Sequence, residues 1–207
     1  MTRTPADSSW PFTRQLLLVL ALVSAPAFAH TGAGEPSGFV HGLLHPVGGW
    51  DHVLAMAGVG LFAWMLKGRA LWALPLTFVA VMALGAVAAA YRLPVPLIEA
   101  GIALSVLGTG VLLARGRAIP VALALPLIAL FAVFHGQAHG NEMPDSASGL
   151  AYGLGFVLAT ALLHGIGLLA GFGLARIAHS RALVIARAGG VAVTAAGALL
   201  LVVALTI

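Results

Sequence analysis

The chain has 207 residues, of which 61% are hydrophobic and only 8% are Asp, Glu, Lys or Arg. Soluble domains carry about 25% charged residues, so this composition excludes an ordinary soluble protein and predicts a membrane protein. The net charge of +4 does not indicate nucleic-acid binding, because the few basic residues lie in short loops. The absence of cysteine excludes disulfides, thiolate metal sites and cysteine nucleophiles.

The first 29 residues have the pattern of a secretory signal peptide. Arg3 and Arg14 supply positive charge, residues 16–23 form a short apolar stretch, and Ala27-Phe28-Ala29 is a small-x-small cleavage motif. An uncleaved first transmembrane helix is the alternative, but the apolar stretch is short for a span. We therefore predict cleavage after Ala29, with residues 30–207 as the mature membrane domain.

Six apolar segments follow, each close to the roughly 20 residues that a transmembrane helix needs. They are residues 46–66, 70–91, 97–114, 118–138, 149–175 and 184–207. The regions after the first, third and fifth segments carry Lys67, Arg69, Arg115, Arg117, Arg176, Arg181 and Arg187. Because loops rich in Lys and Arg stay in the cytoplasm, we predict an all-α, six-helix, multi-pass protein of the inner membrane. Both ends of the mature chain are then periplasmic.

The start of the first segment combines His45, Asp51 and His52. Ionisable groups at a bilayer are expensive and by default mark a functional site. If the helix begins at Pro46, the two histidines lie seven residues apart on one face; if Gly48-Gly49 breaks the helix, unwound backbone brings the three side chains together. Either geometry gathers two imidazoles and a carboxylate around a metal ion. An N-capping aspartate beside interfacial histidines is the structural alternative.

The end of the fourth segment carries His135, His139 and Glu142. Their offsets of four and three residues place them on one stripe of a helix, where two histidines can chelate a metal. Gln137 and Asn141 are candidate hydrogen-bond partners that would fix the imidazole tautomers. A solvated helix end without a ligand role is the alternative.

The sequence His-Gly-x-x-His occurs twice, at residues 41–45 and 135–139. Two three-segment halves of opposite orientation would form an inverted repeat, as in many transporters, although so short a match leaves this open. The predicted topology places both copies at the outer face. His41 either faces the same side as His45, as a further ligand, or is a loop residue.

His164 lies in the middle of the fifth segment without a charged neighbour in the sequence. Burial of an imidazole at that depth favours a place on an ion path over a purely structural role. The same segment is rich in glycine, which predicts close packing against neighbouring helices.

Three motifs in this order resemble the HupE/UreJ family. They are His-Pro-x-x-Gly-x-Asp-His at 45–52, Phe-His-Gly-x-Ala-His-Gly-x-Glu at 134–142 and Leu-His-Gly-x-Gly at 163–167. The resemblance implies a signal peptide with six helices and a permease for nickel or cobalt, connected to hydrogenase or urease maturation. It assigns functional roles to His45, Asp51, His52, His135, His139 and Glu142.

The residues and the resemblance together predict transport of Ni²⁺ or Co²⁺ as a substrate, without a resident cofactor and without enzymatic activity. Imidazole and carboxylate donors would replace part of the hydration shell of the ion at the outer face, and the ion would then pass His164. No GxxxxGK[ST] motif is present, which favours facilitated flux over ATP-driven transport. An intramembrane zinc hydrolase, a b-type cytochrome and a passive metal-binding module are the rival hypotheses. The sequence leaves the oligomeric state open between a monomer and a homo-oligomer.

Overall fold

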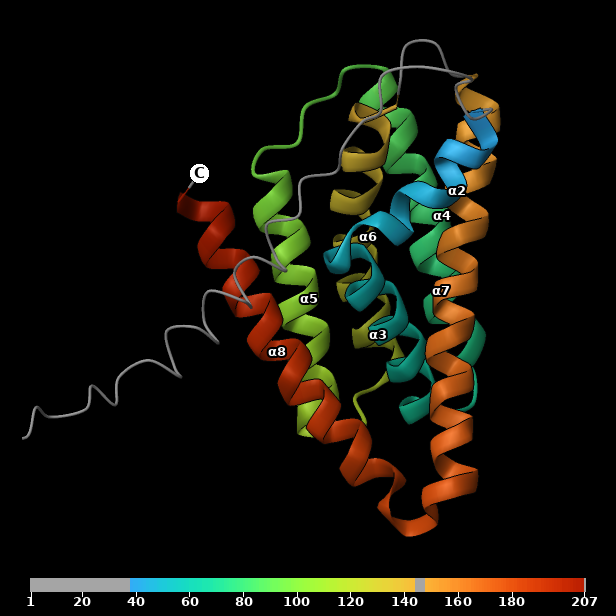
Figure 1. Cartoon of the computed structure of the whole chain (residues 1–207), viewed down its shortest axis with the longest axis vertical. Coiled ribbons are helices and arrows are strands. Elements are labelled where there is room, and N and C mark those ends of the chain that lie inside the picture. Colours follow the sequence, from blue (N-terminus) through green and yellow to red (C-terminus); the bar gives the residue numbers. More distant parts are fainter. Residues whose placement is uncertain (1–37, 144–147, 207) are drawn as a thin grey trace, which may run out of the picture. The chain divides into compact units, whose positions relative to one another are not determined.

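The computed structural model describes residues 38–143 and 148–206. The predicted signal peptide and its cleavage site lie outside these residues. Within them the chain is helical and has no strand. The elements are α2 (Gly38–Gly48), α3 (Trp50–Leu66), α4 (Ala70–Ala90), α5 (Ile98–Arg115), α6 (Val121–Asn141), α7 (Gly149–Ala178), the 3₁₀ turn η1 (His179–Arg181) and α8 (Ala182–Thr206). Figure 1 shows their arrangement.

The first predicted segment is broken into two helices. The axes of α2 and α3 differ by 82°, and the bend lies at Gly49 (Figure 1). Pro46 is inside α2, so the prediction of a helix that begins at this proline is wrong, and the alternative of a break at Gly48-Gly49 is confirmed. Proline has no N–H for a helical hydrogen bond, and glycine adapts to an abrupt change in direction, which explains why α2 ends two residues after Pro46.

Four stretches are long and apolar enough to cross a membrane, or five if the bent pair α2 and α3 counts as one span. The fourth of these is the 58-residue stretch Gly149–Thr206, which contains α7, η1 and α8. His179 interrupts it with a positive φ of 47°. The surface agrees with a lipid environment, because large apolar side chains such as Leu84, Leu169 and Leu205 are more than half exposed.

Helix pairs that are distant in the sequence form the interior of the bundle. The most extensive contacts join α5 to α8, α4 to α6, and α7 to both α2 and α3. Glycines permit these close approaches: a Cβ on Gly60 would overlap the backbone carbonyl of His164, and one on Gly136 would overlap that of Met82. This confirms the predicted packing role for Gly155, Gly167 and Gly171 of α7, but not for Gly165 and Gly173, where a Cβ would meet no neighbour within 4 Å.

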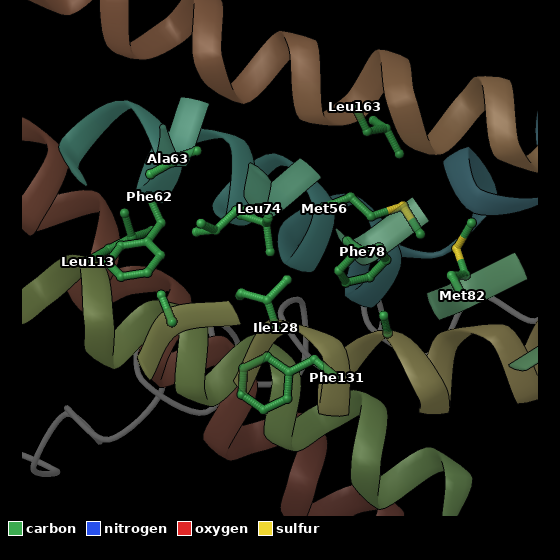
Figure 2. Packing of buried hydrophobic residues seen from close by; sticks show 14 of the residues in the cluster. Met56, Phe62, Ala63, Leu74, Phe78, Met82, Leu113, Ile128, Phe131 and Leu163 are labelled. Atoms are coloured by element: carbon green, nitrogen blue, oxygen red, sulfur yellow. The ribbon is translucent and has the colours of Figure 1, made fainter. Parts of the chain in front are cut away.

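A hydrophobic core fills the middle of the bundle. Figure 2 shows Met56 of α3, Phe78 of α4 and Ile128 of α6 among its side chains, which come from neighbouring helices. All three are fully buried. The two ends of the bundle carry different residues. The helix α3 runs from His52 to the basic turn at Lys67, whereas α6 runs in the opposite direction and ends beyond His139. The histidines therefore lie at one end of the core and the basic turn at the other.

Candidate metal centre

The break between α2 and α3 positions the first pair of histidines. His45 is near the end of α2 and His52 is in the first turn of α3, with their ring centroids 6.3 Å apart. Asp51 Oδ1 accepts hydrogen bonds from the backbone N–H of His52, at 2.7 Å, and from its Nδ1, at 2.8 Å. A Cβ on Gly49 would come within 2.5 Å of this same oxygen, so the glycine leaves room for the carboxylate.

The last two turns of α6 bring the second pair of histidines to the first. His135 and His139 are both 0% exposed. The ring of His52 lies 4.8 Å from that of His135 and 4.9 Å from that of His139, and His45 lies 5.1 Å from His139, measured between centroids. We call these four residues the histidine cluster. Residues about ninety positions apart in the chain therefore meet at one place.

A hydrogen bond between His45 and Glu142 lies at the outer edge of the histidine cluster. Glu142, directly after α6, approaches His45 Nε2 with its Oε2 at 2.7 Å. The two side chains are 48% and 24% exposed, so this pair forms the accessible rim while the α6 histidines lie beneath it. The sequence predicted both residues as parts of one site, and the structure brings them into direct contact.

Several ring nitrogens of the histidine cluster are buried without a hydrogen-bond partner. They are His52 Nε2, His135 Nδ1 and both nitrogens of His139. Buried polar atoms are almost always paired, so such a group of orphaned imidazole nitrogens is suited to bind water or a cation. Asp51 accepts the Nδ1 proton of His52 and leaves Nε2 with the lone pair, which is the tautomer that a metal needs.

The donors are adjacent but do not yet surround a common point. Among residues 38–143 and 148–206, no three His, Asp or Glu side chains are arranged as a ready-made metal shell. Metal binding at the histidine cluster therefore requires the imidazole rings to rotate toward one another. Such a site differs from a structural zinc site, whose four ligands are closed around the ion.

Three residues of this region give no signal in the sequence. Ser105 of α5 contacts His135 Nε2 through Oγ at 2.8 Å, Phe156 of α7 stacks on His139 with centroids 5.0 Å apart, and Tyr152 is buried with its hydroxyl unpaired. None of them belongs to a motif, because serine and aromatic residues in an apolar helix are ordinary packing residues. Only the tertiary contacts reveal them.

A family match accompanies this geometry. The family described as HupE / UreJ protein matches residues 18–200. The chain belongs to the HupE/UreJ family. Protein HupE of Rhizobium leguminosarum bv. viciae is 40% identical over 190 residues, which is 91% of this chain and 97% of that protein. No solved structure matches the chain.

Membership of the HupE/UreJ family confirms the resemblance seen in the three motifs. The family is one of hydrogenase and urease accessory proteins that transport nickel or cobalt. The structure places two of the three motifs of this HupE/UreJ protein in one spot, since residues 45–52 and 134–142 supply the whole histidine cluster.

The third motif of this HupE/UreJ protein lies inside α7, apart from the histidine cluster. His164 is 1% exposed, and neither ring nitrogen has a partner. It is 15 residues into α7, or about 22 Å along the helix. Phe78 separates it from the histidine cluster, with its ring centroid 5.0 Å from His164 and 5.3 Å from His135.

The remaining predicted residues are peripheral. His41 is half-buried and its ring lies 6.3 Å from His45 and 5.9 Å from Tyr152, so it adjoins only the rim of the histidine cluster. Gln137 donates to the Gly85 carbonyl at 3.3 Å and joins α6 to α4. The prediction that Gln137 orients an imidazole is therefore wrong, because its side chain faces the neighbouring helix.

Proposed function

We propose that this protein transports Ni²⁺ or Co²⁺ across the inner membrane into the cytoplasm, with the histidine cluster as its outer binding site. The observation that carries the proposal is the contact of four imidazoles from two distant segments, with several buried nitrogens left unpaired. Imidazole and carboxylate together suit borderline divalent ions of this kind. Family membership supports the same cargo.

Charge balance follows from the carboxylates at the histidine cluster. Neutral imidazoles bind a dication without cancelling its charge, and an uncompensated ion away from water is expensive. Asp51 is hydrogen-bonded to His52, and Glu142 to His45, so each carboxylate lies next to a proposed ligand. We assign His45, His52, His135 and His139 as direct ligands. Asp51 and Glu142 are assigned as their charge-compensating partners.

The open arrangement of the donors supports a transport role. A transport site must bind tightly enough to admit the ion and weakly enough to release it. The rings have to rotate before they surround the ion, and the free energy that this rotation costs lowers the affinity of the site. We propose that the ion then moves inward past Phe78 to His164, whose two unpaired nitrogens provide the next donor on the path.

The membrane arrangement that we propose has six spans. They are α2 with α3, α4, α5, α6, α7 and α8, because the 58-residue apolar stretch is interrupted at His179 and would be about 87 Å long as one helix. The basic turns follow α3, α5 and α7, at the end opposite the histidine cluster. That end is therefore cytoplasmic, and the histidine cluster faces the periplasm.

The helix contacts also support an inverted repeat. The main pairs are α3 with α7, α4 with α6, and α5 with α8. An inverted repeat would make α3 equivalent to α6, α4 to α7 and α5 to α8. When each helix is replaced by its equivalent, the same three pairs result. Substrate sites at the junction of such repeats are common in transporters, and both His-Gly-x-x-His copies contribute to the histidine cluster.

Uptake of radioactive nickel into proteoliposomes tests the proposal. The unaltered protein should give saturable uptake, and His139→Ala should lower it about tenfold or more, because this residue alone has two unpaired nitrogens in the histidine cluster. His179→Ala is the matched control, since that exposed histidine lies in η1 at the opposite end. Equal uptake by the His139 variant and the unaltered protein would remove the site assignment.

A further inference from the structure

Ser105 is a buried hydroxyl with two short contacts. It is 1% exposed and lies in the second turn of α5, in a helix that contacts α6. Its Oγ is 2.6 Å from the carbonyl oxygen of Ile102 and 2.8 Å from Nε2 of His135. The first contact ties the serine to its own helix, and the second reaches the histidine cluster.

The single proton of the hydroxyl decides which way these bonds run. The Ile102 carbonyl can only accept, so Ser105 must donate its proton there. His135 Nε2 must then carry a hydrogen and donate it to Ser105 Oγ. A neutral imidazole has one N–H, so Nδ1 holds the lone pair, and this nitrogen is buried and unpaired.

We propose that Ser105 is a positioning residue of the metal site, which fixes the tautomer and the ring rotation of His135 so that Nδ1 binds the cation. The inference rests on the proposed function. It gives the histidine cluster two ligands oriented through opposite atoms: Asp51 accepts Nδ1–H of His52 and leaves Nε2, whereas Ser105 accepts Nε2–H of His135 and leaves Nδ1.

The two orienting groups have different electrostatic effects. A carboxylate that accepts an imidazole proton makes the opposite nitrogen a stronger donor, and a neutral hydroxyl does so much less. His135 is therefore the weaker of the two ligands. It is also the member of the histidine cluster next to Phe78, on the side of His164. The weaker donor thus lies where the ion must leave.

Co²⁺ binding to the purified full-length protein in detergent tests this role, by equilibrium dialysis and by the visible spectrum of the bound ion. Ser105→Ala should weaken binding about tenfold or more and change the spectrum, as expected when a residue that orients a ligand is lost. Thr109→Val is the matched control. Thr109 lies one turn further along α5, is equally buried and has an unpaired hydroxyl, so its replacement should leave binding within about twofold.

A double replacement shows whether Ser105 acts through His135. If it does, Ser105→Ala should have little further effect in a His135→Ala background; full additivity of the two losses would overturn the proposal. Unchanged Co²⁺ binding by Ser105→Ala would also overturn it. If the unaltered protein binds neither Co²⁺ nor Ni²⁺, the proposed function fails instead.

The tautomer can be observed without any metal or change at Ser105. In ¹⁵N-histidine NMR of the unaltered protein, the resonances lost in His135→Ala identify this imidazole. The geometry requires the proton on Nε2. A proton on Nδ1 would contradict the proposal, whatever the binding data show.

Discussion

Replacing Asp51 by asparagine is expected to weaken Ni²⁺ binding at least about tenfold. The Asp51 carboxylate accepts two bonds from His52, at 2.7 Å from the backbone nitrogen and 2.8 Å from Nδ1. A hydrogen bond to a charged group contributes about 1.5–3 kcal/mol, against about 0.5–1.5 kcal/mol for a neutral one. The backbone bond is present with or without metal, whereas the Nδ1 bond strengthens when His52 binds a cation.

The change in the Nδ1 bond gives the minimum affinity loss, because Asp51 also compensates the charge of the cation. Neutralising the acceptor of this bond removes about 1–1.5 kcal/mol, which corresponds to roughly a tenfold rise in Kd. Asparagine keeps an oxygen that can hold the ring, whereas Asp51→Ala also releases the tautomer and should raise Kd by about 100-fold. The two variants thus separate the charge of the carboxylate from its orienting role.

Equilibrium dialysis of the purified protein against radioactive nickel measures these constants. Thr109→Val, a buried replacement outside the histidine cluster, serves as the control for nonspecific effects. Equal affinities for the asparagine variant and the unaltered protein would refute the electrostatic reasoning. Equal affinities for the asparagine and alanine variants would refute the claim that Asp51 orients His52.

Three further outcomes are expected. Nickel affinity should fall as the pH is lowered, because protons compete with the cation for the imidazole lone pairs; an affinity that is the same at every pH at which the protein stays folded would mean that histidines are not the ligands. His164→Ala should leave equilibrium binding within about twofold while abolishing uptake by proteoliposomes, since the histidine lies beyond Phe78; loss of both would place it in the outer site. Gly136→Ala should lower the melting temperature in detergent, because its Cβ would overlap the Met82 carbonyl at a cost of about 1–3 kcal/mol, whereas Gly173→Ala should not. Equal melting temperatures for the two glycine variants would contradict the close approach of α4 and α6.

The helices themselves could be predicted well from the sequence. The segments expected at 70–91 and 97–114 end within a residue or so of α4 and α5, because their apolar stretches stop at charged or glycine-containing turns. The predicted start of the first segment was wrong. Proline is a frequent first residue of helices, but Pro46 occupies the last turn of α2, and the chain changes direction at Gly49.

The sequence predicts which residues belong to the candidate site, but not how they are arranged. The sequence predicts His45 and Glu142 at the same face of the membrane, but a distance of 2.7 Å between them depends on the 82° bend between α2 and α3. Ser105 could not be recognised, since one serine in an apolar helix gives no periodic or motif signal. Its importance follows from a single contact with His135 across the helix interface.

X-ray absorption spectroscopy of the nickel-loaded protein shows whether the histidine cluster binds the ion, because imidazole ligands give a characteristic multiple-scattering pattern. We expect several imidazoles on one nickel ion, one fewer in His52→Ala and in His139→Ala, and an unchanged number in His179→Ala. A shell made of oxygen atoms alone, or one that stays the same in the His52 and His139 variants, would contradict the claim that α2, α3 and α6 bind the ion together.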